Sequence, residues 1–170
     1  MIKNMIPDYM KCLIFGAFLG TLSKYLDTVA IDGRWQANVL HYFSNMFTRL
    51  GIWVFIATMI AAYSKTIIRA AINTFVFFSG MLISYYLYSA YLFGFFPTKY
   101  FILWGSVALC SPLAGIVVWK GKNSSRSAAY ILPALPMGLL LSLALGFGLF
   151  DMRINYIEEV LMYVFLCVFF

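Results

Sequence analysis

Polar residues recur at helical spacing just ahead of the second long apolar run of the chain. At about 100° per residue, positions separated by three or four residues share one face of a helix. Such a face presents amide, imidazole and guanidinium groups that can bind the polar parts of a ligand. The helix either lies on a surface with this face in water or covers a cavity between other helices. The recurring residues are Asn38, His41, Asn45, Thr48 and Arg49.

A second set of ionisable residues could meet the first. Lys24 and Asp27 are three residues apart and can meet on one helical face. Ionised side chains in apolar surroundings are costly unless they are paired, so we expect these scarce charges to form one polar cluster. The cluster is either a static clasp between helices or a vestibule for a ligand or ion. Its acidic members near the C-terminal end are Asp151, Glu158 and Glu159.

Sequence signatures of catalysis and of metal binding are missing. His41 is the only histidine, and no serine or cysteine nucleophile motif accompanies it. Gly-x-Ser-x-Gly, His-Glu-x-x-His and Walker-type loops do not occur. The three cysteines are far apart within apolar segments, which gives neither a disulfide framework nor a zinc site. We therefore expect no enzymatic activity, no metal site and no cofactor.

The composition indicates that the lipid bilayer is the environment of these residues. Of the 170 residues, 64% are hydrophobic and 11% are charged, and the mean hydropathy is +0.89. Soluble domains contain about 25% charged residues, so this chain cannot cover a globule with polar surface. The net charge of +6 is spread among apolar runs, which argues against binding to nucleic acid.

The apolar runs predict one all-α domain over residues 1–170, a polytopic transmembrane bundle of about six helices. A helix of about 20 apolar residues crosses a bilayer. The charge-free run 70–96 is about 40 Å long at 1.5 Å per residue, so it must tilt or bend before Pro97 ends it. Ser111 and Pro112 should interrupt the fourth helix. The expected helices are 10–26, 46–63, 70–96, 100–119, 128–150 and 154–170, with an external amphipathic segment at 36–45.

The distribution of Lys and Arg predicts the orientation of this bundle. Short cytoplasmic loops carry an excess of these residues. With the N-terminus inside, seven fall on the inner side and five on the outer side. We therefore expect both termini in the cytoplasm. The inner set is Lys3, Lys11, Lys65, Arg69, Lys120, Lys122 and Arg126, and the outer set is Lys24, Arg34, Arg49, Lys99 and Arg153.

Small and polar residues mark two helix faces for close packing. Gly16 and Gly20 form a Gly-x-x-x-Gly pattern in the first expected helix, and small residues allow helix backbones to approach closely in a membrane. Asn73, Gly80 and Ser84 share one face of the third expected helix, and we expect that face to pack inward.

Five short segments of the chain carry a resemblance to known proteins: Tyr63-Ser-Lys-Thr66, Arg69-Ala-Ala-Ile-Asn73, Gly80-Met-Leu-Ile-Ser-Tyr-Tyr86, Gly94-Phe-Phe-Pro97 and Ser111-Pro112. They resemble a family of small bacterial integral membrane proteins of unknown function, typical of Gram-positive anaerobes. The resemblance implies a multi-pass protein of the bacterial cytoplasmic membrane and no known activity. In helix number and size alone, the chain is also similar to the six-helix substrate-binding subunits of energy-coupling-factor vitamin transporters, although Gly16 and Gly20 stand where those subunits use an alanine-rich docking face.

Two functions remain open from the sequence. The first is a membrane protein that binds and transports a small molecule or ion through an outward-facing polar vestibule. The second is a non-transporting accessory, immunity or assembly subunit that packs against a larger membrane partner, or a second copy, through Gly16, Gly20 and the polar face of the third helix. The expected vestibule residues are Lys24, Asp27, Asn38, His41, Asn45, Arg49, Asp151, Glu158 and Glu159.

Overall fold

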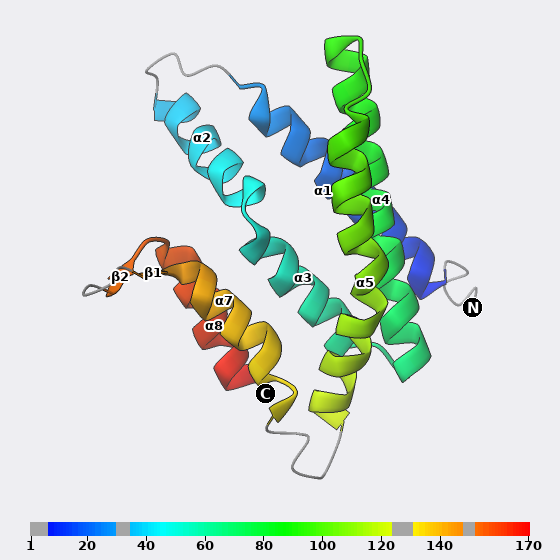
Figure 1. Cartoon of the computed structure of the whole chain (residues 1–170), viewed down its shortest axis with the longest axis vertical. Coiled ribbons are helices and arrows are strands. Elements are labelled where there is room, and N and C mark those ends of the chain that lie inside the picture. The colour runs from blue at the N-terminus through cyan, green and yellow to red at the C-terminus, as the bar shows by residue number, and fades with distance from the viewer. Residues whose placement is uncertain (1–6, 30–34, 124–130, 148–151) are drawn as a thin grey trace, which may run out of the picture.

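The computed structural model describes residues 7–29, 35–123, 131–147 and 152–170, which form seven helices and one pair of short strands (Figure 1). In these ranges the expectation of an all-α chain holds except at the strands. In chain order the elements are α1 (Asp8–Asp27), α2 (Trp35–Thr48), α3 (Leu50–Ala62), α4 (Ile67–Phe93), α5 (Thr98–Asn123), α7 (Ala134–Ala144), β1 (Leu145–Phe147), β2 (Met152–Ile154) and α8 (Ile157–Phe169).

The two longest helices, α4 and α5, form an antiparallel hairpin (Figure 1). Both are long and apolar enough to cross a membrane. At the start of α4, the side chain of Thr66 accepts a hydrogen bond from the Arg69 amide at 3.2 Å, which caps the helix. Gly94, with a φ of 72°, ends it, because a left-handed residue terminates a helix. The expected end at residue 96 before Pro97 is therefore wrong, and α4 stops at the glycine.

Helix α5 continues through Pro112, although an interruption was expected there. Proline has no amide hydrogen, so the carbonyl of Ala108 loses its usual donor. The hydroxyl of Ser111 donates to that carbonyl at 2.7 Å. A hydroxyl side chain can satisfy a freed backbone carbonyl within a membrane helix, so α5 is not interrupted at Pro112. The helix also extends beyond the expected range 100–119 at both ends.

Glycines bring α1 and α4 into backbone contact along their length. The two helices run in the same direction, and a Cβ atom on Gly16 or Gly20 would overlap backbone oxygens of α4. A Cβ on Gly80 would lie 2.6 Å from the backbone oxygen of Leu13 in α1. Larger residues at these positions would force the helices apart. Gly16, Gly20 and Gly80 therefore serve packing within the chain.

Helices α2 and α3 form a pair that bends by 67° at Arg49. Arg49 has extended backbone angles and precedes the first residue of α3. The indole of Trp53 donates to the carbonyl of Phe47 at 2.8 Å, and Thr48 donates to the carbonyl of Asn45 at 2.9 Å, so carbonyls freed by the break keep partners. The expected boundary between the segment 36–45 and the helix 46–63 is therefore wrong. The first helix, α2, continues to Thr48, and the second helix, α3, begins at Leu50.

The third structural unit is a short helical hairpin, α7 and α8, joined through the antiparallel strands β1 and β2. Helix α7 begins after Pro133 and ends at Ala144, where an expected helix 128–150 would have continued; residues 128–130 and 148–150 lie outside the described ranges. Its 11 residues give about 16 Å at 1.5 Å per residue, roughly half the hydrocarbon thickness of a bilayer. The expected full-length span is therefore wrong, and α8 likewise starts at Ile157 instead of 154.

Both described ends of the chain lie at the same end of the bundle. Asp8 at the start of α1 lies 3.6 Å from Arg69 at the start of α4. Phe169 at the end of α8 packs against Tyr63 at the end of α3, with ring centroids 5.3 Å apart. Tyr63 and Arg69 flank the connection between α3 and α4. Six complete spans are not present in the described residues: two helices are both long and apolar enough to cross a membrane, and three spans are possible if the bent pair counts as one.

Candidate functional site

A cavity of about 580 Å³ lies between α3, α4 and α5, with further walls from α1, α2 and α7. Its volume falls in the range of small-molecule pockets, about 300–1,000 Å³. The walls are mainly apolar and aromatic, and a few hydroxyl groups and one carboxylate interrupt them. Lining residues that combine size and aromaticity are Phe47, Trp53, Phe78, Tyr85, Tyr86 and Trp104.

Among the described residues that line this cavity, Asp27 at the C-terminal end of α1 is the only acidic one. The hydroxyl of Tyr85 in α4 donates to Asp27 Oδ2 at 2.7 Å, and the hydroxyl of Ser44 in α2 donates to Oδ1 at 3.2 Å. An ionised carboxylate can accept about four hydrogen bonds, so acceptor capacity remains for a ligand. Asp27 thus joins three helices and gives the apolar cavity one polar end.

Lys24 does not pair with Asp27. Its ammonium group lies 5.1 Å from the ring centroid of Tyr85 and 5.0 Å from that of Phe93, within the range of cation–π interactions. Lys24 therefore contacts aromatic rings of α4, and the expected contact between Lys24 and Asp27 is not formed. Tyr85 consequently contacts both Lys24 and Asp27, and it holds the carboxylate of Asp27 toward the cavity.

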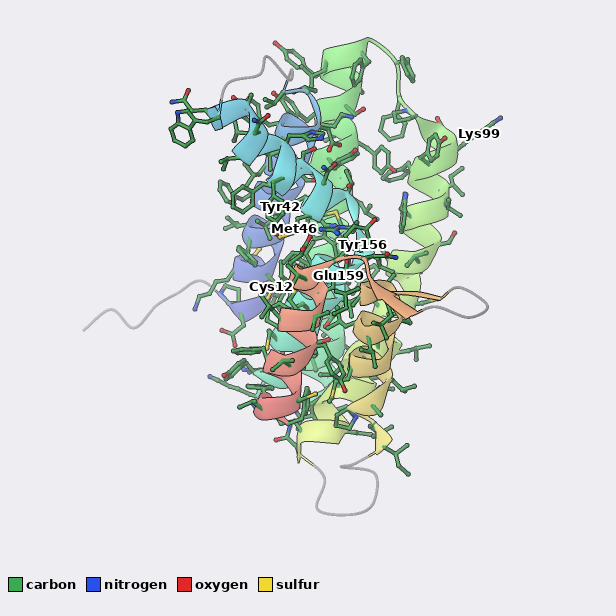
Figure 2. All side chains as sticks on the ribbon, turned by 90° about the vertical axis from the view of Figure 1, so that its left-hand side faces the viewer. Cys12, Tyr42, Met46, Lys99, Tyr156 and Glu159 are labelled. Carbon is green, nitrogen blue, oxygen red and sulfur yellow. The ribbon has the colours of Figure 1, made fainter. Side chains whose placement is uncertain are left out.

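A separate charged cluster lies at the break between α2 and α3. The Arg49 guanidinium donates to Glu158 Oε1, and its Nε lies 3.8 Å from Glu159 Oε1. The ring of Tyr156 stacks against the guanidinium, with 3.7 Å between Arg49 Cζ and the ring centroid. Figure 2 shows Tyr156 and Glu159 at the start of α8, near the mid-height of the molecule. The structure therefore brings the basic and acidic residues together at the helix break, where an outer rim was expected.

Close packing at this cluster depends on Gly51, the second residue of α3. A Cβ atom there would lie 2.7 Å from Glu159 Oε1 and 2.9 Å from Glu159 Cδ. Glu159 is only 2% exposed. The glycine lets the carboxylate side chain lie directly on the backbone of α3.

The remaining expected vestibule residues lie elsewhere. Asn38, His41 and Asn45 are exposed on α2 and do not line the cavity. The amide nitrogen of Asn45 lies 3.2 Å from Nε2 of His41, so these two satisfy each other on the helix surface. Asp151 lies outside the described residues. The eight described residues thus separate into Asp27 at the cavity, Lys24 on aromatic rings, the cluster of Arg49 with Glu158 and Glu159, and the exposed residues of α2.

The packing residues of α4 contact other parts of the same chain. Buried Asn73 donates to the Ser64 hydroxyl at 3.1 Å, and the Ser84 hydroxyl donates to the Met81 carbonyl at 3.1 Å beside Gly20. Because α1 occupies the small-residue face of α4, the surface assigned to a larger membrane partner is already filled within this chain.

Sequence reasoning missed the residues that make the cavity. Tyr85, Ser44 and Trp53 come from three different helices and have no spacing that relates them to Asp27. The one available signal was chemical, since a carboxylate at the end of an apolar helix requires hydrogen-bond donors, and Tyr85 is one of several hydroxyl-bearing residues of α4 that could supply one.

Among the described residues, no group of three His, Cys, Asp or Glu side chains is placed to hold a metal ion. A scan against protein-family models and searches of curated proteins and of solved structures found no match to this chain.

Proposed function

We propose that this chain is a multi-pass protein of the bacterial cytoplasmic membrane that binds and transports a small, mainly apolar amine. The observation that carries the proposal is the Asp27 carboxylate at the end of the apolar cavity between α3, α4 and α5. A carboxylate in an apolar space favours a cationic donor, because a charge-assisted hydrogen bond is strong where water is excluded. The aromatic walls suit the apolar body of such a molecule.

The broken helix pair beside the cavity supports transport in addition to binding. Thr48 and Leu50, on the two sides of the break, both line the cavity. Discontinuous helices frame the substrate sites of many transporters, where they allow one part of the bundle to move against another. The bend at Arg49 is therefore the expected hinge of the proposed movement.

The distribution of cations supports an orientation with the described chain ends in the cytoplasm. Among the described residues, five cations lie at the end of the bundle formed by the α3–α4 connection, whereas Lys24 and Lys99 lie toward the other end. Cytoplasmic loops are enriched in Lys and Arg. The Asp27 end of the cavity would then be the outer one. The five cations are Lys11, Lys65, Arg69, Lys120 and Lys122.

Binding of tryptamine and of its uncharged analogue tryptophol to the purified full chain in detergent tests the proposal. We expect tryptamine to bind about tenfold more tightly, since a hydrogen bond to a charged group contributes about 1.5–3 kcal/mol and 1.4 kcal/mol is tenfold. Asp27→Asn should abolish the difference. Val107→Trp, which fills the cavity, should weaken both ligands, and the matched control Leu109→Trp on the exposed side of α5 should not.

Three results would contradict the proposal. Absence of saturable tryptamine binding would exclude the ligand class. A tryptamine preference that survives Asp27→Asn would remove the role of the carboxylate. Equal effects of Val107→Trp and Leu109→Trp would place binding outside the cavity.

A further inference from the structure

The cluster at the α2–α3 break holds two carboxylates and one guanidinium away from water. The side chains of Arg49, Glu158 and Glu159 are 17%, 15% and 3% exposed. Of the elements that pack against α8, neither α3 nor α7 contains a charged residue. Lys122 of α5 also contacts α8, but it lies on the ring of Phe169 at the opposite end of that helix from Glu159. The side chain of Arg153, in the neighbouring strand β2, is outside the described part of the chain. With both carboxylates ionised, the described cluster would therefore carry one excess negative charge.

The hydrogen bonds show which carboxylate carries the excess. Arg49 donates to Glu158, while its Nε remains 3.8 Å from Glu159 Oε1, too long for a hydrogen bond. Glu159 Oε2 is buried and has no hydrogen-bond partner among the described residues. A buried, ionised carboxylate without hydrogen bonds is strongly unfavourable, so Glu159 requires a neutralising partner.

A proton satisfies that requirement better than a metal ion. Sodium, magnesium or calcium in a protein needs several oxygen ligands around it, and the described residues bring no third acidic side chain to this place. A proton needs only the unpartnered Glu159 oxygen. The Tyr156 ring, which covers Arg49, further restricts the space for a hydrated cation.

We propose that Glu159 is a proton-binding site that links protonation to the contact between α8 and the α2–α3 break. The carboxylate takes up one proton when α8 packs on Gly51, and it releases that proton to water when the contact opens. Raising the pH should therefore weaken the contact, because the deprotonated cluster holds an uncompensated charge. This inference is independent of the amine site, since it invokes neither the cavity nor Asp27.

Infrared spectroscopy of the purified full chain at neutral pH tests the proposal without any ligand. Wild type should show one carboxylic-acid carbonyl band that shifts in deuterium oxide. Glu159→Gln should lose it. Glu158→Gln should lose it too, because Arg49 is then free to neutralise Glu159. Arg49→Gln should increase it about twofold, because both carboxylates then need protons. A wild-type spectrum without the band, or a band that persists in Glu159→Gln, would overturn the proposal.

Thermal stability provides a second measurement that requires only mild variants. Glutamine has the shape of a protonated glutamate, so Glu159→Gln should leave the melting temperature at neutral pH unchanged. Glu158→Gln removes the hydrogen bond from Arg49 to Glu158 and leaves Arg49 only the longer contact with Glu159 at 3.8 Å, so it should lower the melting temperature. A loss in Glu159→Gln as large as that in Glu158→Gln would show that Glu159 is ionised and would refute the inference.

Discussion

The close contact between α1 and α4 makes a quantitative prediction for Gly80→Ala. The new methyl group would lie 2.6 Å from the Leu13 carbonyl oxygen and 3.3 Å from the Ala17 amide nitrogen. Those are backbone atoms, so relief requires one helix to move. Overpacking of this kind costs about 1–3 kcal/mol, and a severe backbone overlap belongs near the upper limit. Alanine recovers about 1 kcal/mol of helix propensity, which leaves a net loss of about 2 kcal/mol.

Gly105→Ala in α5 is the matched control, because a Cβ atom there has no neighbour within 4 Å. Gly105→Ala therefore gains the same helix propensity without an overpacking cost, which stabilises the chain by about 1 kcal/mol. For a chain of this size, 1 kcal/mol corresponds to a shift of about 2–4 °C in melting temperature. Gly80→Ala should therefore melt about 4–8 °C below wild type in detergent, and Gly105→Ala about 2–4 °C above it.

Tryptamine binding supplies a functional measurement for the same pair of variants. Moving α1 away from α4 lengthens the hydrogen bond from Tyr85 to Asp27, so Gly80→Ala should also weaken binding, whereas Gly105→Ala should not. The reasoning would be refuted if the two alanine variants changed stability in the same direction. It would also fail if Gly80→Ala melted at the wild-type temperature, since that would mean the helices do not approach at the glycine.

Two further predictions concern the polar end of the cavity and the orientation. Tyr85→Phe removes the 2.7 Å hydrogen bond to Asp27 and should lower the free energy of unfolding by about 1.5–3 kcal/mol. The control Ser106→Ala removes an exposed hydroxyl and should lower it much less. Equal losses in the two variants would contradict a stabilising hydrogen bond between Tyr85 and Asp27. Lys99→Cys should react with a membrane-impermeant maleimide in intact cells and Lys120→Cys only after lysis, because Lys120 belongs to the cation-rich end; the opposite labelling pattern would reverse the proposed orientation. Figure 2 shows Lys99 projecting away from the bundle, where a reagent can reach it.

Several features follow from local sequence and were predicted with useful accuracy. The helices at 10–26, 70–96 and 100–119 correspond to α1, α4 and α5, with ends displaced by a few residues. Hydropathy and helix propensity are local sums over neighbouring residues, so they predict where long helices form. The proximity of Arg49 to Glu158 was expected on similarly general grounds, because few opposite charges are available in an apolar chain.

Other boundaries required knowledge of distant partners. Leu145–Phe147 is apolar enough to extend a helix, yet it pairs with Met152–Ile154 as a strand. A short apolar run has the same composition in either structure. The break at Arg49 is likewise stabilised by residues distant in sequence, Tyr156 and the acidic residues of α8. Arg49 therefore lies at the bend between α2 and α3, where the end of a helix was expected.

The sequence alone was sufficient to indicate a helical protein that is apolar enough to cross a membrane and has few charges, because composition, hydropathy and charge are properties of the chain itself. The cavity and its polar end depend on the tertiary structure. Asp27 and Tyr85 are 58 positions apart, and the residues that line the space beside them come from α1, α2, α3, α4, α5 and α7. Such a site forms where the surfaces of different helices meet, so the spacing of residues along one helix cannot predict it.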